Sequence, residues 1–146
     1  MLRVSVKLVV RPLLALVLLG GQPLAAAEAA QPRGSLVIIG GALRADNAAV
    51  WHRMVELAGG KGARIAVFAS ASANPEKSGQ FFVDRFKEYG ANAFFVPVAV
   101  RLHGIDYRAA ADHPALAASV PSGGGALFLG GDQSRITPAL RRADGS

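Results

Sequence analysis

Short apolar runs alternate with amphipathic stretches along most of the chain, and this alternation predicts the secondary structure. Four runs are largely apolar and lack a polar residue at every second position: residues 35–39, 64–69, 93–96 and 126–129. Runs of this kind are typical of strands that are covered on both faces, as in parallel sheets. We therefore expect four buried strands, of which Ser35–Ile39 is the first.

The segments between the first three runs have the spacing of helices. Apolar residues recur three, four and seven positions apart in residues 50–58, after a cap at Asp46 or Asn47. Asn74 and Pro75 fit the cap and the first position of a second helix, because proline lacks the N–H that goes unpaired there. Each of these helices has one apolar stripe to place against a sheet.

The remaining segments predict shorter elements. Residues 102–106 have the composition of a loop, and the alanine-rich residues 107–120 predict short helical pieces that restart at Asp112-His-Pro114. Residues 133–142 predict a helix that is interrupted or restarted at Thr137-Pro138. Strands that alternate with helical connections predict an α/β fold with three αβα layers, a parallel sheet and helices on both faces.

The amino-terminal residues have the pattern of a secretory signal peptide. The apolar run of residues 13–19 is preceded by three cations: Arg3, Lys7 and Arg11. Small residues follow in 24–30, and we place cleavage after Ala27. The predicted organisation is therefore a signal peptide at 1–27, a linker at 28–34 and an α/β domain at 35–146, exported to the periplasm or the extracellular space.

The composition narrows the class of protein further. With 51% hydrophobic and 18% charged residues, the chain is typical of a folded domain. The apolar run from Pro12 to Gly21 is about half the ~20 residues that a spanning helix needs, so no stable membrane anchor is expected. Cleavage after Ala27 removes three cations and no acid, and the formal charge falls from +6 to +3. The remaining Lys and Arg form no run, which argues against nucleic-acid binding.

Polar residues gather directly after the fourth apolar run. Gly130-Gly131 permits a sharp turn, and Asp132, Gln133 and Arg135 follow it at the carboxyl end of the predicted strand. Ligands of open α/β sheets bind at that edge, so these three residues are the best candidates for a site. The alternative is an ordinary strand-to-helix turn with solvated side chains.

Other chemistry has less support. Ser70 and Ser72 follow the second run, but no base lies nearby in sequence, and serines in such turns commonly bond the backbone. The three histidines, His52, His103 and His113, lack metal-ligand spacing in a chain without cysteine, so no metal is expected. Neither G-x-G-x-x-G nor the G-K-[ST] of a phosphate loop occurs, so no cofactor is expected.

Three stretches together resemble one family, cyanophycinase and related serine peptidases. They are Leu36-Val-Ile-Ile-Gly-Gly41, Ile65-Ala-Val-Phe-Ala-Ser-Ala-Ser72 and Leu127-Phe-Leu-Gly-Gly-Asp-Gln-Ser-Arg-Ile-Thr137. The last is the specific one, and the resemblance spans residues 35–142 in order. It implies a flavodoxin-like domain akin to class I glutamine amidotransferases.

The resemblance also implies an activity and roles for the candidate residues. Cyanophycinase-like enzymes release β-Asp-Arg dipeptides from arginyl-polyaspartate through a serine on a strand-to-helix elbow, a histidine base and an oxyanion hole. On this chain, the backbone at Gly131 and Asp132 would form part of the oxyanion hole, while Gln133 and Arg135 would bind the peptide or polymer substrate, which is cyanophycin in this family. The resemblance allows a homodimer of the complete protein.

The chain departs from the family in one respect. The family's nucleophile lies in a G-T-S-A-G elbow, and no G-x-S-x-G occurs in these 146 residues. The expectation is therefore an incomplete serine peptidase that lacks its nucleophile, histidine and acid, and is inactive alone. Two alternatives stay open: a small exported α/β binding module without enzymatic activity, and a related serine hydrolase that acts on another acyl substrate.

Overall fold

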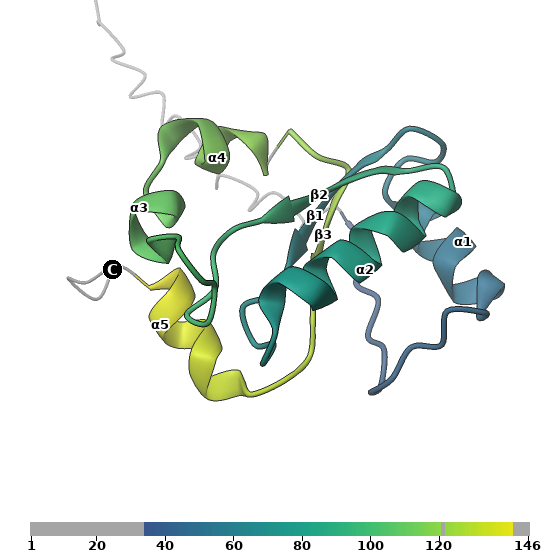
Figure 1. Cartoon of the computed structure of the whole chain (residues 1–146). Coiled ribbons are helices and arrows are strands. Elements are labelled where there is room, and N and C mark those ends of the chain that lie inside the picture. Colours follow the sequence, from purple (N-terminus) through teal and green to yellow (C-terminus); the bar gives the residue numbers. More distant parts are fainter. Residues whose placement is uncertain (1–33, 121, 142–146) are drawn as a thin grey trace, which may run out of the picture. The chain divides into compact units, whose positions relative to one another are not determined.

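The structure of the protein is a computed structural model, and it describes residues 34–120 and 122–141. Its centre is an all-parallel sheet of three strands in the order β2-β1-β3 (Figure 1), built from β1 (Arg64–Phe68), β2 (Asn92–Val96) and β3 (Gly125–Phe128). The predicted α/β class and parallel sheet are confirmed, and three of the four predicted strands are present. The predicted signal peptide at 1–27 lies outside the described residues.

Helices cover both faces of this sheet, as the strand–helix alternation predicts. The helical elements are α1 (Ala48–Leu57), α2 (Pro75–Glu88), α3 (Tyr107–Ala111), α4 (Pro114–Ser119), the 3₁₀ turn η1 (Gln133–Arg135) and α5 (Ile136–Leu140). Figure 1 shows α3, α4 and α5 grouped together, apart from α1 and α2. The side-chain packing assigns α1 and α2 to one face of the sheet and α3, α4 and α5 to the other. We call these the α1–α2 face and the α3–α5 face.

The core on the α1–α2 face is built around Trp51, which is fully buried. Its ring lies 5.4 Å from the ring of Phe86 and 5.9 Å from that of Tyr89, and its Nε1 donates a hydrogen bond to the Arg44 carbonyl at 3.1 Å. Val67 of the central strand packs into the same cluster. Buried aromatic side chains of this size supply much of the burial energy of a small domain.

The core on the α3–α5 face is smaller. Phe68 and Val96 of the sheet meet Ala139 of α5, and partly buried residues of the two short helices, Tyr107 and Leu116, pack against them. No residue of α3 or α4 is itself buried. The α3–α5 face is therefore covered more loosely than the α1–α2 face.

The helix starts follow the predicted capping chemistry where the helices are long. The Asn47 side chain accepts a hydrogen bond from the Val50 N–H, and the Asn74 side chain accepts one from the Lys77 N–H at 3.1 Å. Pro75 opens α2, as predicted. Capping of this kind satisfies N–H groups that have no partner inside the helix.

The short helices depart from the prediction in two places. Pro114 does open α4, but the cap residue is His113, whereas Asp112 is the C-cap residue that follows α3. The predicted interruption of the last helix is present but lies one residue before Thr137-Pro138, because η1 gives way to α5 at Ile136 and α5 runs through Pro138. Proline is tolerated there because it lies in the first turn of a helix, where its missing N–H removes no bond.

The predicted first strand, Ser35–Ile39, is also wrong for this structure. The segment has no regular secondary structure and pairs with no described strand, and Leu36 and Ile38 are each 85% exposed. Only Ile39 packs on the α1–α2 core. A β-branched run favours extended backbone, but a strand also needs a partner along its hydrogen-bonding edge, and the run does not specify that partner.

Candidate functional site at the carboxyl end of β3

The turn after β3 lies against the turn after β1. Gly131 has a φ of +147°, and a Cβ added to it would lie 2.1 Å from the Ala71 carbonyl oxygen. Only glycine fits such an approach, because any side chain would overlap that oxygen. The glycine pair thus brings the ends of two adjacent parallel strands together, at the edge of the sheet where the polar residues were predicted to gather.

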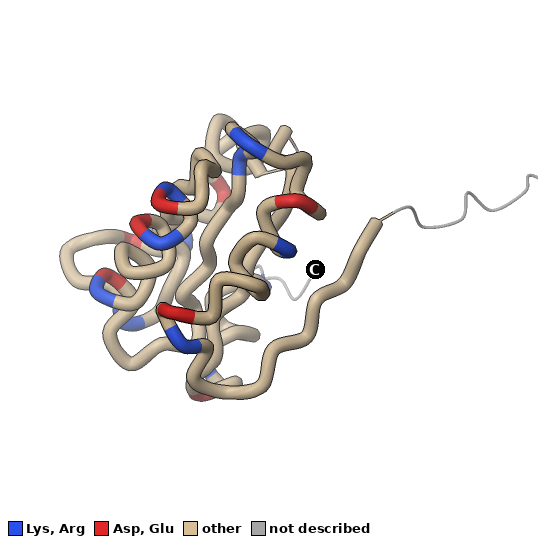
Figure 2. Tube along the Cα trace, turned by 90° about the vertical axis from the view of Figure 1, so that its right-hand side faces the viewer, with Lys and Arg blue, Asp and Glu red and all other residues tan. Residues whose placement is uncertain are grey.

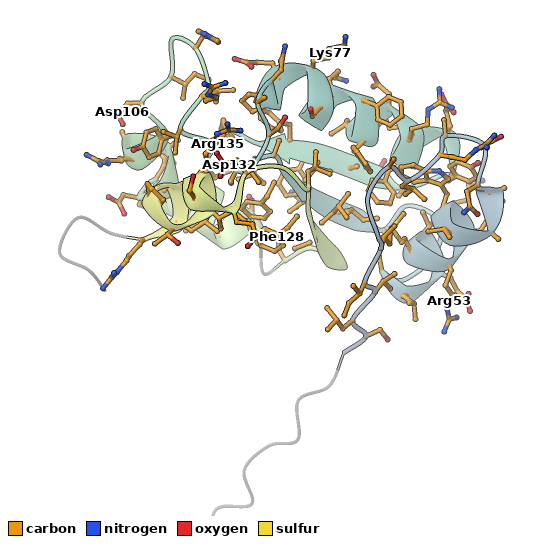
Figure 3. All side chains as sticks on the ribbon, turned by 90° about the horizontal axis from the view of Figure 1, so that it is seen from below. Arg53, Lys77, Asp106, Phe128, Asp132 and Arg135 are labelled. Carbon is orange, nitrogen blue, oxygen red and sulfur yellow. The ribbon has the colours of Figure 1, made fainter. Side chains whose placement is uncertain are left out.

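Two groups of the β3 turn bind the Ala71 carbonyl. The Asp132 N–H donates to it at 2.9 Å, and Nη1 of Arg135 donates to it at 3.0 Å. Arg135 also pairs with the Asp132 carboxylate, with 3.2 Å between Nη2 and Oδ2. Figure 3 shows the two side chains together, next to the start of α5. Asp132, Arg135 and Ala71 therefore form one connected set, which we call the β1–β3 clasp.

The Asp132 carboxylate is held by its own turn as well. It accepts hydrogen bonds from the Ser134 hydroxyl at 2.7 Å and from the Ser134 N–H at 3.0 Å. These bonds favour the charged form and hold the pKa of Asp132 below its ordinary value; the charges of Arg135 and Arg101 act in the same direction. Asp132 is therefore a structural anion at neutral pH.

The four residues predicted for the site are close together, but they differ in whether their polar groups already have hydrogen-bond partners. The Asp132 N–H is committed to Ala71, whereas the Gly131 N–H has no hydrogen-bond acceptor among the described residues. The Gln133 side chain is exposed and makes no hydrogen bond within the same part of the chain. The Arg135 side chain is only 22% exposed and is engaged by the β1–β3 clasp. Gly131 and Gln133 are thus the two residues of the set with groups left for a ligand.

The two serines at the end of β1 are buried and already bonded. Ser70 Oγ donates to the Val98 carbonyl, beyond the end of β2. Ser72 Oγ lies 2.8 Å from Ser78 Oγ and accepts the Asn74 N–H at 3.1 Å. Ser70 therefore ties the turn after β1 to the segment after β2, and Ser72 ties it to the start of α2, in agreement with the structural role that serines in such turns commonly have.

None of the three histidines interacts with the β3 turn in the part of the chain that the structure describes. The His52 ring lies edge-on to that of Tyr89, and His113 occupies the N-cap position of α4 without a capping hydrogen bond from its side chain. His103 is 93% exposed, and its Nδ1 lies 3.4 Å from Glu76. The His103 N–H also donates to that carboxylate, which lowers the pKa of Glu76. No histidine of residues 34–120 and 122–141 therefore lies in place to act as a base at the β3 turn.

The same described residues hold no cluster of three or more His, Cys, Asp or Glu that could bind a metal ion. Figure 2 shows Lys and Arg interspersed with Asp and Glu along the described part of the trace. No helix within the described ranges is both long and apolar enough to cross a membrane.

The clasp is the feature that sequence reasoning missed. Arg135 and Ala71 are 64 residues apart in sequence, and no spacing rule links them. The one local signal was the second glycine, because a Gly-Gly pair at the end of a strand is typical of a close backbone approach.

Comparison with models of known protein families and with solved structures finds no match for this chain. A function for the β3 turn is therefore inferred from the fold and from the local geometry.

Proposed function

We propose that this chain carries the amino-terminal part of an exported, cyanophycinase-like serine peptidase, and that the turn after β3 is one wall of its active site. The observation that carries the proposal is that this turn is held in place while two of its polar groups have no hydrogen-bond partner. The β1–β3 clasp fixes it at the carboxyl edge of a parallel sheet while the Gly131 N–H and the Gln133 side chain stay unengaged. Ligands of open α/β sheets bind at that edge.

The two unengaged groups have distinct roles in this proposal. The Gly131 N–H donates to the oxyanion that develops when a hydroxyl attacks the scissile carbonyl, and Gln133 hydrogen-bonds the substrate. The Asp132 N–H would have to leave Ala71 to join the oxyanion hole, so we assign that role to Gly131 alone. Arg135 is assigned to the clasp instead of to substrate binding.

The rest of the machinery has to come from outside these residues. The sequence contains no G-x-S-x-G, and none of its described histidines interacts with the β3 turn. An attacking serine, a histidine that takes its proton and an acid that orients the histidine are all required for acyl transfer by this route. We therefore expect the 146-residue chain alone to hydrolyse nothing.

The experiment compares two forms of the protein on two substrates. One form is the 146-residue chain, and the other is the product of the same gene read past codon 146 in every frame. Release of β-Asp-Arg from arginyl-polyaspartate by the longer form alone is the expected result. Cleavage of ordinary peptides instead would move the proposal to a different acyl substrate. A gene that encodes no G-x-S-x-G downstream, with no hydrolysis by either form, would overturn it.

Export is a separate part of the proposal and has its own test. The amino-terminal pattern of residues 1–27 predicts that the mature protein begins at Glu28. Amino-terminal sequencing of protein recovered from the periplasm or the medium should find Glu28 first. Recovery of the whole product in the cytoplasm, with Met1 at its start, would contradict export.

A further inference from the structure

The segment after β2 and the turn after β3 are both anchored to the turn after β1. Ser70 Oγ donates a hydrogen bond to the Val98 carbonyl, beyond the end of β2. The next residue, Ala71, accepts hydrogen bonds from the Asp132 N–H and from Nη1 of Arg135. The strand order β2-β1-β3 places this turn between the other two. The residues that follow all three strands therefore converge at the edge of the sheet that carries the candidate site.

Arg101 lies in a turn after β2 that is held on both sides. Ala99 and Leu102 are buried, and the Leu102 N–H donates to the Ala99 carbonyl at 3.1 Å. The His103 N–H donates to the Glu76 carboxylate at 2.9 Å, which ties the same turn to the start of α2. Arg101 itself is exposed. A fixed backbone therefore presents a side chain that solvent can reach.

The Arg101 guanidinium makes no hydrogen bond or ion pair within residues 34–120 and 122–141. Its charge acts on Asp132: after the Ser134 hydrogen bonds and the charge of Arg135, the charge of Arg101 also lowers the pKa of Asp132. The pKa of Glu76 is lowered chiefly by the hydrogen bond from the His103 N–H, without a contribution from Arg101. The Arg101 charge thus acts at the β3 turn and not at the start of α2.

The balance of charge at the β3 turn favours one further anion. Asp132 and Arg135 pair with each other, so their charges cancel, and Arg101 adds one positive charge. A single carboxylate would balance that charge, whereas a dianion would leave negative charge beside Asp132. The planar guanidinium also matches a carboxylate with two parallel N–H donors. A carboxylate is therefore the ligand group that fits Arg101.

We propose that Arg101 is a substrate-binding residue that pairs with one carboxylate of a peptide held along the β3 turn. The inference rests on the proposed function, because that function supplies the peptide and the roles of the Gly131 N–H and the Gln133 side chain. Arg101 then adds a second point of attachment, on the β2 side of the turn after β1. A peptide with a carboxylate at the matching position binds more tightly than one with a carboxamide there.

A titration with two blocked tripeptides tests this assignment. N-acetylated and C-amidated Ala-Asp-Ala and Ala-Asn-Ala differ by a single carboxylate, and NMR of the 146-residue chain at low ionic strength measures weak binding of each. We expect the aspartate peptide to bind about threefold to tenfold more tightly than the asparagine peptide, and to shift the amide signals of Gly131 and Gln133. The preference should shrink at high salt, because the charges are exposed.

Three variants identify the residue responsible. Arg101→Gln should bind the two peptides equally, while Arg101→Lys keeps the charge without the planar fork and should keep part of the preference. The matched control is Lys61→Gln, which removes one exposed positive charge in the turn before β1, at the opposite edge of the sheet. Lys61→Gln should keep the full preference of the parent chain.

The remaining outcomes overturn the assignment. An unchanged preference in Arg101→Gln would mean that Arg101 only balances the charge of Asp132, and an equal loss in Lys61→Gln would mean that net charge alone attracts the peptide. Binding of neither peptide by the parent chain would also overturn it. The titration needs no hydrolysis, so its result is separate from the test of the peptidase. A gene without a downstream nucleophile would overturn the proposed function but would leave a carboxylate preference at Arg101 in place.

Discussion

The two strands that flank β1 differ in how they are held. On the β2 side, α2 packs over the sheet, and Val96 is almost fully buried at the strand end. Both strands are at an edge of the described sheet, but β3 alternates between partly buried and exposed residues. The β2 side is therefore stabilised largely by burial, whereas the β3 side depends on its pairing with β1 and on the β1–β3 clasp.

The comparison bears on function because the candidate site lies on the less buried side. The β1–β3 clasp gives the turn after β3 a fixed shape without burying it. A site needs both properties, since its groups must be positioned and must also be reachable by a substrate. Substitutions on the two sides should accordingly differ in how much stability they cost and in which interaction they remove.

The largest expected contrast is between two phenylalanines. Phe86 is 1% exposed in the α1–α2 core, and Phe86→Ala should lower the free energy of unfolding by about 3–5 kcal/mol. Phe128 is half-exposed, and Phe128→Ala should cost about 1 kcal/mol through loss of its stacking on Phe68. Urea unfolding of both variants measures the difference. Equal losses would mean that β3 is as deeply buried as the core.

A second contrast uses the adjacent glycines of the turn. Gly131→Ala would place a Cβ against the Ala71 carbonyl at a strained φ, and should cost about 2–3 kcal/mol. Gly130→Ala has open space around it and should stay within about 0.5 kcal/mol of the parent chain. Thermal unfolding distinguishes them. If both variants melt together, the close approach to Ala71 does not exist in solution.

A third contrast separates the clasp from an ordinary surface ion pair. Arg135→Ala removes the bond to the Ala71 carbonyl and the pair with Asp132, at a cost of about 1–2 kcal/mol. Arg53 forms an exposed pair with Glu56, so Arg53→Ala should cost less than about 0.5 kcal/mol. Chemical denaturation in 0.1 M salt is the measurement. A loss at Arg135 no larger than at Arg53 would mean that the clasp does not stabilise the turn.

The smallest effect is a dependence on pH. The pKa of Asp132 is lowered in the folded state by the Ser134 hydroxyl and N–H, so its contribution to stability is present above the unfolded value of about 3.9 and is lost as pH falls through the folded value. Asp132→Asn should remove this part of the acid sensitivity. Stability curves of the parent and the variant between pH 7 and pH 2 should converge below about pH 4. Curves that stay parallel would contradict the role of the carboxylate.

Local signals in the sequence were enough to predict most of the fold. The runs at residues 64–69 and 93–96 match β1 and β2 within one or two residues, and the caps at Asn47 and Asn74 form as predicted. Capping and apolar spacing depend on neighbours in sequence, so they can be recognised without the structure. The run at residues 35–39 carries the same signal and fails, because pairing depends on a partner elsewhere in the chain.

The site was predictable in place but not in detail. The glycine pair and the polar residues after it locate the turn at the carboxyl end of β3, since the strand and the breaker are both local features. The assignment of Arg135 was not predictable, because its partner Ala71 lies in another turn. The hydrogen bond from the Asp132 N–H to the same carbonyl could not be predicted for the same reason.

The most direct test of the proposed hydrolase site at this turn is the kinetics of Gln133→Ala in the longer form of the protein that the proposal requires. Gln133 is exposed and unbonded, so its removal should leave folding unchanged while kcat/KM on arginyl-polyaspartate falls by about tenfold or more. The matched control is Gln80→Ala, an exposed glutamine on α2 that should keep the parent kcat/KM. Equal kcat/KM values for the two variants and the parent enzyme would contradict a substrate-binding role for this turn.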